Sequence, residues 1–218
     1  MGLFITFEGI EGCGKTTQLE LAADKLGKHG YPAIVTAEPG GTPLGKKIRE
    51  ILLKRSDLSV SAEAELFMFL ADRAQHVREV IMPALKAGKI VLCDRFSDAT
   101  VAYQGYGRGL PIEMIEKLNS LATAGLVPDL TILLDLEIET GLGRLRNRAT
   151  ETDRMEKEEI AFHSRVRQGY LTIAREEKER VYIVDASKDM AAVHREVMGL
   201  IEGLIREKRD VFSTHSRP

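Results

Sequence analysis

The chain has 218 residues, enough for one well-buried α/β domain, and its 31 basic and 33 acidic side chains leave a net charge of -2. This balance gives no general electrostatic reason to expect nucleic acid or an anionic membrane as a partner. The two cysteines, Cys13 and Cys93, fit neither a disulfide framework nor a metal site, and no run approaches the ~20 apolar residues of a membrane span. We therefore expect a cytoplasmic protein, with one domain over residues 1–206 and a flexible tail over residues 207–218.

The first motif follows a short apolar run at residues 3–7. Glu8 ends this run, and a glycine-rich loop with the pattern GxxxxGK[ST] leads from it into a segment of helical spacing. In such a loop the backbone N–H groups point at phosphate oxygens, the lysine reaches the β- and γ-phosphates, and the threonine hydroxyl takes a place on Mg²⁺. A glycine-rich turn without a ligand is the alternative. The residues that we expect to contact the nucleotide are Gly9, Ile10, Glu11, Gly12, Cys13, Gly14, Lys15, Thr16 and Thr17.

Short apolar runs recur along the chain, and longer segments of helical spacing separate them. This alternation predicts βαβ units, that is, a parallel five-stranded sheet of the P-loop NTPase type flanked by helices. Ligands of such sheets bind at the carboxyl ends of the strands. Each run here ends in a polar cluster, which fits that placement. The runs cover residues 3–7, 33–36, 90–93, 130–136 and 181–184.

The segment over residues 62–86 is expected to form a helix with two apolar faces. One face carries Leu66, Phe69 and Leu70 and ends in Arg73; the other carries Phe67, Ala71 and Ala74. A helix that is apolar on two sides is covered on two sides, once by the core and once by something else. A second subunit and a fully internal helix are both open at this point.

Two further strand ends carry candidate residues for a second ligand. Residues 38–42 form a turn after the second run, and Arg49 lies about two turns into the next helix, near enough to meet a bound phosphate. Asp94 and Arg95 follow the third run; the first can hold Mg²⁺ through water, and the second presents a fork suited to a phosphate. The alternatives are a purely structural turn and a plain surface ion pair.

Small residues dominate the stretch over residues 100–109. They allow the backbone to approach a ligand closely, and Tyr103 and Gln104 supply polar contacts within this stretch. We therefore expect it to form part of the same binding site.

The segment over residues 144–154 holds four arginines in eleven residues. Exposed basic turns are common without a function, which is the alternative. Phosphoryl transfer, however, requires positive charge against the equatorial oxygens of the transferred group and shielding from water. We therefore predict a short arginine-rich lid over about residues 144–156, with Arg146, Arg148, Asp153 and Arg154 as its polar members.

Together these motifs resemble thymidylate kinase, a family of P-loop nucleoside monophosphate kinases that convert dTMP to dTDP with ATP. The similarity covers nearly the whole chain, and several of the motifs are specific to that family rather than to P-loop proteins at large. It rests on Phe69 with Arg73 and on residues 7–18, 38–42, 94–96, 102–105, 128–131 and 153–156.

The resemblance implies a role for individual residues of the acceptor site. Phe69 would stack on the thymine ring, Arg73 would donate to thymine O4, and Tyr103 would crowd the sugar 2′ position. The residues implied for dTMP binding are Glu8, Pro39, Arg49, Phe69, Arg73, Arg95, Thr100, Tyr103 and Gln104, of which Arg49 and Arg95 hold the monophosphate.

The resemblance also implies ATP and Mg²⁺ as cosubstrate and cofactor, and a homodimer. Arg144 would lie near the adenine, and the Mg²⁺ site would be formed by Thr16, Glu8 and Asp94, partly through water. The implied catalytic residues are Lys15, Arg95, Arg148, Glu8 and Asp94.

Two features of the chain depart from the usual family pattern. Phe96 and Ala99 stand where the family usually has Tyr and Ser, which puts particular hydrogen bonds in doubt but no catalytic group. Residues 10–13 contain no arginine or lysine, and Glu11 would if anything repel a phosphate. We therefore expect the lid to supply the transition-state arginine, with Arg148 as the first candidate and Arg154 as the second.

Three other functions compete with this interpretation. Another nucleoside monophosphate or deoxynucleoside kinase would share the P-loop and lid and differ at Phe69, Arg73 and Tyr103. A GTPase-type switch should contain an Asn-Lys-x-Asp motif, which the sequence lacks. A nucleic-acid-remodelling ATPase would need a basic surface, against which the near-neutral charge argues.

Overall fold

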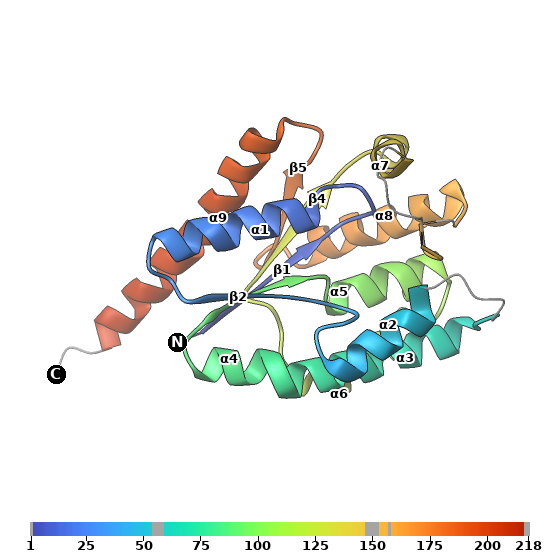
Figure 1. Ribbon diagram of the computed structural model, residues 1–218, viewed down its shortest axis with the longest axis horizontal. Helices are drawn as coiled ribbons and strands as arrows, with labels where there is room; N and C mark the ends of the chain where they lie inside the picture. The colour runs from blue at the N-terminus through green and yellow to red at the C-terminus, as the bar shows by residue number, and fades with distance from the viewer. Residues whose placement is uncertain (1, 54–58, 147–152, 157, 216–218) are drawn as a thin grey trace.

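The computed structural model describes residues 2–53, 59–146, 153–156 and 158–215. Its centre is a parallel sheet of five strands in the order β2-β3-β1-β4-β5 (Figure 1). The expected five-stranded α/β architecture is thereby confirmed. The strands are β1 (Leu3–Glu8), β2 (Ala33–Ala37), β3 (Ile90–Asp94), β4 (Leu130–Asp135) and β5 (Val181–Asp185).

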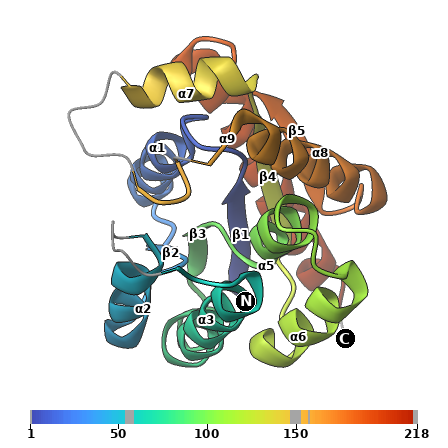
Figure 2. The ribbon, with the colours of Figure 1, turned by 90° about the vertical axis from the view of Figure 1, so that its right-hand side faces the viewer.

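Helices cover both faces of the sheet. On one face α1 (Lys15–Lys28) packs against α9 (Met190–His215), and on the other lie α4 (Met82–Lys86) and α8 (Ile160–Glu176) (Figures 1 and 2). Successive residues of β1 point to opposite faces: Ile5 shares a core cluster with Leu19 of α1, whereas Phe4 shares one with Ile81. A strand buried on both faces typically has a nearly continuous apolar sequence, and residues 3–7 show this pattern with Thr6 as the one polar member.

The segment expected as one helix over residues 62–86 has three parts. α3 (Ala62–His76) continues through a π-helical turn η1 (Val77–Ile81) into α4. Ser61 caps the start of α3, because its hydroxyl accepts from the N–H of Ala64 at 3.3 Å. Pro83 has no N–H to donate, and the widened turn ends two residues before it, at Ile81.

Several helices surround the carboxyl ends of the strands, and α6 packs against α3 and η2. Figure 2 shows α2, α3, α5 and α7 around that end of the sheet. Their bounds are α2 (Pro43–Leu53), α5 (Ser97–Thr100), the π-helical η2 (Val101–Gly107), α6 (Ile112–Thr123) and α7 (Ile138–Arg146).

The flexible tail over residues 207–218 stays a prediction; in the structure α9 continues to His215. Two contacts explain why the helix runs past residue 206. Lys208 forms a 3.0 Å ion pair with Asp129, and the Arg209 guanidinium lies 5.2 Å from the centre of the Tyr31 ring. Only residues 216–218 of the expected tail lie outside the described residues.

Among the described residues, none of the helices combines the length and the apolar character that crossing a membrane requires.

Candidate active site

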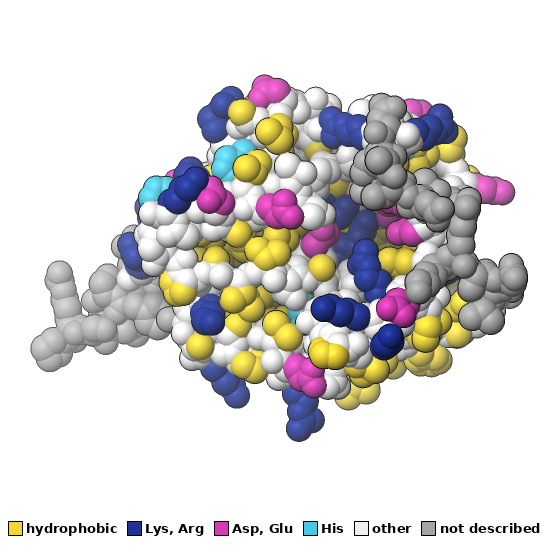
Figure 3. All heavy atoms as spheres, in the orientation of Figure 1, with side chains coloured by type: hydrophobic (Ala, Val, Ile, Leu, Met, Phe, Trp, Pro, Cys, Tyr) yellow, Lys and Arg dark blue, Asp and Glu magenta, His cyan; other side chains and the backbone are white. Residues whose placement is uncertain are grey.

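Residues that follow β1, β2 and β3 meet around one cavity of about 870 Å³. Figure 3 shows this hollow in the surface, with Lys and Arg side chains gathered around it. Most of the residues predicted to form the site line it. These are Glu11, Gly12, Cys13, Gly14, Lys15, Thr16, Thr17, Pro39, Arg49, Phe69, Arg73, Asp94, Arg95, Thr100, Tyr103, Gln104, Arg144 and Asp153.

The P-loop wraps the start of α1. Gly12 and Gly14 have φ angles of 72° and 92°, and a Cβ on Gly12 would lie 2.2 Å from the Gly141 carbonyl oxygen, so only glycine fits there. The Lys15 ammonium donates to the carbonyls of Gly9 and Ile10 at 3.0 and 2.8 Å. Gly9 and Ile10 themselves do not line the cavity; they contribute these carbonyls from behind it.

Thr16 and Asp94 form the candidate Mg²⁺ site. The Thr16 hydroxyl donates to Asp94 Oδ2 at 2.7 Å, and both residues line the cavity. A hydroxyl and a carboxylate are oxygen ligands that fit Mg²⁺, which usually completes its octahedron with water and substrate phosphates. The pair supplies two such oxygens at the edge of the cavity. Among the described residues, no cluster of three or more His, Cys, Asp or Glu side chains is placed to hold a metal ion.

Glu8 occupies a different position from the one predicted. It is fully buried and does not line the cavity; its carboxylate accepts from the Phe96 N–H at 2.7 Å and from the Tyr170 hydroxyl at 2.7 Å. Burial, reinforced by the Asp98 carboxylate, raises the pKa of Glu8 to about 8, although Arg95 and the two hydrogen bonds act in the opposite direction. Glu8 therefore supports the site from behind and is not placed as a ligand of phosphates or Mg²⁺.

Arg95 lies at the junction between the P-loop and the opposite wall. Its φ of 69° is unusual for a residue other than glycine. One guanidinium nitrogen donates to the Gly9 carbonyl and to the Tyr170 hydroxyl, both at 3.0 Å, and the other to Glu11 at 2.9 Å. The guanidinium also lies 4.8 Å from the centre of the Tyr103 ring.

Glu11 was expected to repel a phosphate, but the structure surrounds it with donors. Arg95 and the Tyr103 hydroxyl donate to Oε1, and His163 Nδ1 lies 3.3 Å from Oε2. Burial alone would raise the pKa of Glu11; the His163 hydrogen bond and the charges of Arg95 and Lys15 outweigh it and hold that pKa well below its usual range. Glu11 is thus an ionised group whose charge is compensated locally.

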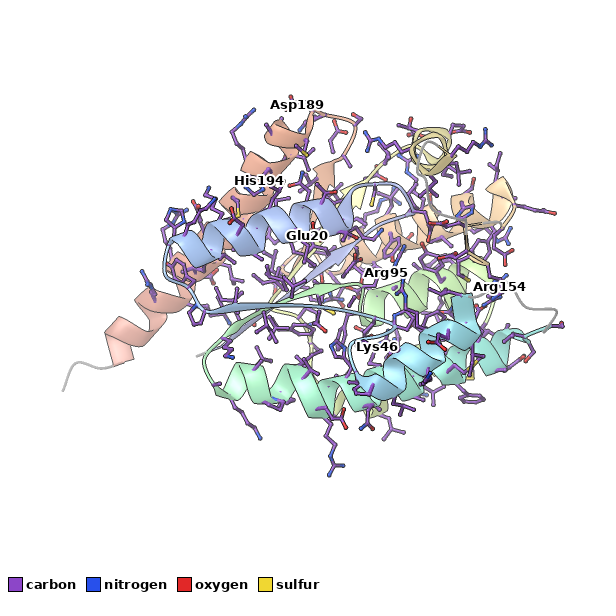
Figure 4. The ribbon with its side chains drawn as sticks, in the orientation of Figure 1. Glu20, Lys46, Arg95, Arg154, Asp189 and His194 are labelled. Carbon is purple, nitrogen blue, oxygen red and sulfur yellow. The ribbon has the colours of Figure 1, made fainter. Side chains whose placement is uncertain are left out.

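The turn after β2 faces the side of α3. Arg49 donates to the Pro39 carbonyl at 2.9 Å and lines the cavity, as does Lys46, also on α2 (Figure 4). Phe69 and Arg73 lie one helical turn apart on α3, and both line the cavity. Arg73 is only 2% exposed, and Glu38, Thr100, Asn119 and the Phe96 carbonyl all accept from it.

The predicted lid residues are distributed unevenly. Arg144 lines the cavity and donates to the Gly12 carbonyl at 3.4 Å and to the Ala186 carbonyl at 3.2 Å. Arg146 is exposed and does not line the cavity. Arg154 donates to the Leu52 carbonyl at 2.8 Å and to Glu65, away from the cavity lining. Arg148 lies outside the described residues.

Several residues of the site escaped the sequence analysis. Tyr170 and His163 on α8 contact Glu8, Arg95 and Glu11 across more than 70 positions of sequence, with no motif around them. Glu38 stands inside a recognised motif, but only the structure shows that it pairs with Arg73 at 2.8 Å. The wall beside Arg144 also includes Lys188, Met190 and Val193, which no local pattern marks as ligand-binding.

Comparison with known proteins decides the family. A family model described as thymidylate kinase matches residues 7–197. A thymidylate kinase of Syntrophus aciditrophicus is 55% identical over 203 residues, which cover 90% of this chain and 93% of the relative. One of Desulfovibrio desulfuricans is 50% identical over 212 residues, covering 94% and 98%. The chain is also similar to the crystal structure of thymidylate kinase from Ehrlichia chaffeensis, with a TM-score of 0.75, 36% identity and coverage of 92% and 98%.

The chain belongs to the thymidylate kinase family. Phosphorylation of dTMP with ATP is the known reaction of thymidylate kinases, and the suspected resemblance is confirmed. In this kinase Phe96, one of the two departures from the family pattern, lies in the core with its ring edge-on to Phe4 at 4.8 Å. A hydroxyl at that position would need a buried partner, so Phe is the simpler solution here. Ala99, the other departure, lines the cavity.

Proposed function

We propose that this kinase transfers the γ-phosphoryl group of ATP to the phosphate of dTMP within the cavity described above. One observation carries the proposal: the P-loop, the turn after β2 and the α3 residues Phe69 and Arg73 line a single cavity. ATP would bind on the side of the P-loop and Arg144, and dTMP on the side of α3. The two phosphates would then meet between Lys15 and Arg95.

The acceptor base is read by stacking and by one donor. Thymine presents an acceptor at O4 and a 5-methyl group, whereas cytosine presents an amino donor at the same position. Phe69 provides the stacking surface, and Arg73 donates to O4 and would meet an unpaired donor in cytosine. A uracil base would pass this test, and one methyl group is worth no more than about 1 to 3 kcal/mol of discrimination. Tyr103 closes the site on the sugar side, beside Thr100 and Gln104.

The phosphates are held by positive charge from three elements. Arg49 and Arg95 bind the dTMP phosphate, whose oxygen attacks the γ-phosphorus of ATP while the bond to the ADP oxygen breaks. Lys15 leaves the carbonyls of Gly9 and Ile10 to contact the β- and γ-phosphates. Bound Mg²⁺, held by Thr16 and Asp94, would neutralise charge on the phosphate oxygens.

The lid supplies the remaining charge. Arg148 is proposed as the transition-state arginine, since residues 10–13 hold no basic side chain. Arg154 is the weaker candidate, because Glu65 and the Leu52 carbonyl already accept from its guanidinium. The expected location in the cytoplasm stays a prediction, consistent with Cys13 and Cys93, which are both unpaired.

The proposed assembly is a homodimer formed through α3. Phe67 is 59% exposed, and Ala71 and Ala74 are exposed beside it along the helix, whereas Leu66 and Leu70 are buried. These residues are the second apolar face expected from the sequence. An exposed aromatic within an apolar stripe is typical of a surface that a partner covers, and the same stripe on a second copy is a suitable partner.

Replacing Arg73 tests the acceptor assignment. Arg73→Ala should lower kcat/KM for dTMP by about ten- to a hundredfold and lower the ratio of dTMP to dCMP activity, because one charged donor to the base is lost. A coupled ADP-release assay with dTMP, dUMP, dCMP and dGMP measures both effects. Arg78→Ala is the matched control, since Arg78 is an exposed arginine just beyond α3. An unchanged dTMP to dCMP ratio in Arg73→Ala would remove this residue from base recognition.

A further inference from the structure

The Arg73 guanidinium is held by an unusually complete set of partners. Its Nε donates to Glu38 at 2.8 Å, Nη1 donates to Thr100 and to Asn119, both at 2.7 Å, and Nη2 donates to the Phe96 carbonyl at 2.9 Å. An arginine has five N–H groups, so these bonds account for four of them. Among the contacts of the described residues, a single Nη2–H of Arg73 has no protein acceptor.

The guanidinium is also fixed in its plane. It lies 5.3 Å from the centre of the Phe96 ring. Its acceptors come from three separate parts of the chain: the residue after β2, α5 with its N-cap Phe96, and α6. Arg73 nevertheless lines the cavity while being 2% exposed. The remaining Nη2–H is therefore the donor left for a ligand in the cavity.

We propose that Asn119 and His76, neither of which lines the cavity, are positioning residues that set the base selectivity by immobilising Arg73. This inference rests on the proposed role of Arg73 in reading the base and extends it to two residues outside the site.

Asn119 acts directly on the guanidinium. It lies on α6, is 6% exposed, and its Oδ1 accepts from Arg73 Nη1. Its Nδ2 donates to the Ser97 carbonyl at 3.2 Å, which fixes the amide so that the oxygen faces Arg73. The neutral amide oxygen of Asn119 accepts from Nη1, and the Glu38 carboxylate accepts from Nε. Together the two acceptors prevent rotation of the Arg73 guanidinium.

His76 acts through Glu38. Its Nδ1 lies 2.8 Å from Glu38 Oε1, while Arg73 takes Oε2, and its Nε2 lies 2.6 Å from the Thr36 hydroxyl. A proton on Nδ1 lets His76 donate to Glu38 and leaves Nε2 to accept from Thr36. His76 has no exposed surface, and a Cβ on Gly41 would lie 2.4 Å from its ring, so the ring is closely packed against the turn after β2. Glu38 is thereby held in place for Arg73.

Because the Arg73 guanidinium is held in place, its one hydrogen bond to the base can discriminate between thymine and cytosine. A mobile arginine that faced the cytosine amino group would swing aside, find water or a carbonyl elsewhere on the base, and lose little binding energy. A fixed guanidinium leaves its donor and the amino donor opposed and desolvated, and an unpaired buried donor costs about 1–3 kcal/mol. Weakening the support of Arg73 should therefore reduce discrimination more than it reduces turnover.

The test compares two variants at position 119. Asn119→Ala removes the acceptor, and the ratio of kcat/KM for dTMP to that for dCMP should fall by about tenfold, equivalent to one lost hydrogen bond to a charged group. KM for ATP should stay within about twofold. Asn119→Asp keeps an oxygen for Arg73 and should retain most of the ratio. Thr123→Val, which removes a buried hydroxyl on the same helix without a contact to Arg73, should leave it unchanged.

A second pair tests the path through Glu38 if the position 119 variants fail to fold, as judged by circular dichroism. His76→Leu should lower the dTMP to dCMP ratio, and His76→Asn, whose amide places an N–H near the position of Nδ1, should restore part of it. Ratios within about twofold of the parent in all folded Asn119 and His76 variants, alongside a reduced ratio in Arg73→Ala, would overturn the inference and leave the base site intact. An unchanged ratio in Arg73→Ala would instead refute the base site and the inference together.

Discussion

The two walls of the cavity are built in different ways. The acceptor wall contains buried side chains held by hydrogen bonds: Arg73 donates to Thr100, Gln104 donates to Glu65, and Arg73, Thr100 and Gln104 are each at most 2% exposed. The donor wall is formed by backbone of the P-loop, by the buried side chain of Lys15 and by exposed side chains, such as those of Thr16 and Arg144. Selectivity for a base requires desolvated groups in fixed positions, whereas phosphates are held by backbone N–H groups and mobile charges. We therefore expect the residues that set base specificity to lie in the acceptor wall and the residues that act in phosphoryl transfer to lie in the donor wall.

Lys15→Ala is expected to have the largest effect and to separate the walls. The ammonium belongs to the donor wall and would contact the β- and γ-phosphates of ATP, so kcat should fall by about 10³-fold or more. dTMP affinity should change by less than about threefold, because the hydrogen bonds of Lys15 within the described part of the chain go to the P-loop residues Gly9, Ile10 and Cys13. Steady-state kinetics and calorimetry with dTMP measure the two effects. A comparable loss of both would show that the walls are not independent.

Arg148→Ala probes the transfer step between the walls. An arginine supplied to a phosphoryl transition state is worth about 10³ to 10⁵ in kcat, so the variant should lose most of the rate with little change in either KM. Arg154→Ala should lose much less, since Glu65 and Leu52 hold that side chain. Arg146→Ala is the matched control from the same segment. If both Arg148→Ala and Arg154→Ala keep kcat within about threefold of the parent, the charge must come from Arg95 or Lys15.

The donor wall and the fold could be predicted from the sequence because their signals are local. The GxxxxGK[ST] pattern places Lys15 and Thr16 in consecutive positions, and all five strands are short apolar runs bounded by polar clusters. The P-loop pattern and the strand pattern can each be recognised within a window of about ten residues. Such local order is what periodicity and motif spacing measure.

The acceptor wall could be predicted only in part, because its bonds join residues far apart in the sequence. Arg73 was predicted, yet its partner Asn119 lies 46 residues away on another helix. Glu8 appeared as a phosphate-side carboxylate, but Tyr170, 162 residues away, and the Phe96 N–H turn it inward. The helical end of the chain was missed because Lys208 pairs with Asp129 across the fold.

Glu8→Gln sharpens the comparison, because Glu8 connects the two walls. The Phe96 N–H donates to Glu8 while the Phe96 carbonyl accepts from Arg73, and Tyr170 joins Glu8 to Arg95. The folded pKa of about 8 lies above the ordinary value of 4.5, so the folded state binds this proton more tightly. Its contribution to stability is complete below about pH 4.5 and is lost as the pH rises towards 8.

The expected result is a difference in the slope of melting temperature against pH. Between pH 5 and 8 the parent should lose up to about 3 to 5 °C per pH unit relative to Glu8→Gln, which cannot ionise. Thermal melts followed by circular dichroism at four pH values measure the slopes. Asp185→Asn is a control, because Asp185 is an exposed carboxylate at the end of β5. Parallel slopes in the parent and Glu8→Gln would mean that Glu8 is ionised in the folded protein.

Phe67→Arg concerns a surface outside both walls and should have the smallest effect on chemistry. Arginine in the centre of the exposed apolar stripe would place two like charges opposite each other across a two-fold axis, which opposes association. Sedimentation should show about twice the chain mass of 24.2 kDa for the parent and a shift towards the single-chain mass for the variant. Ile183→Arg, at a half-exposed position on the edge strand β5, should remain dimeric.

Phe67 does not line the cavity, so kcat should stay within about threefold as long as Phe69 and Arg73 keep their places on the same helix. If the ratio of kcat/KM for dTMP to that for dCMP falls in the dissociated variant, the acceptor wall depends on the partner subunit. If the parent sediments as a monomer with full activity, the exposed apolar face of α3 is not a dimer interface.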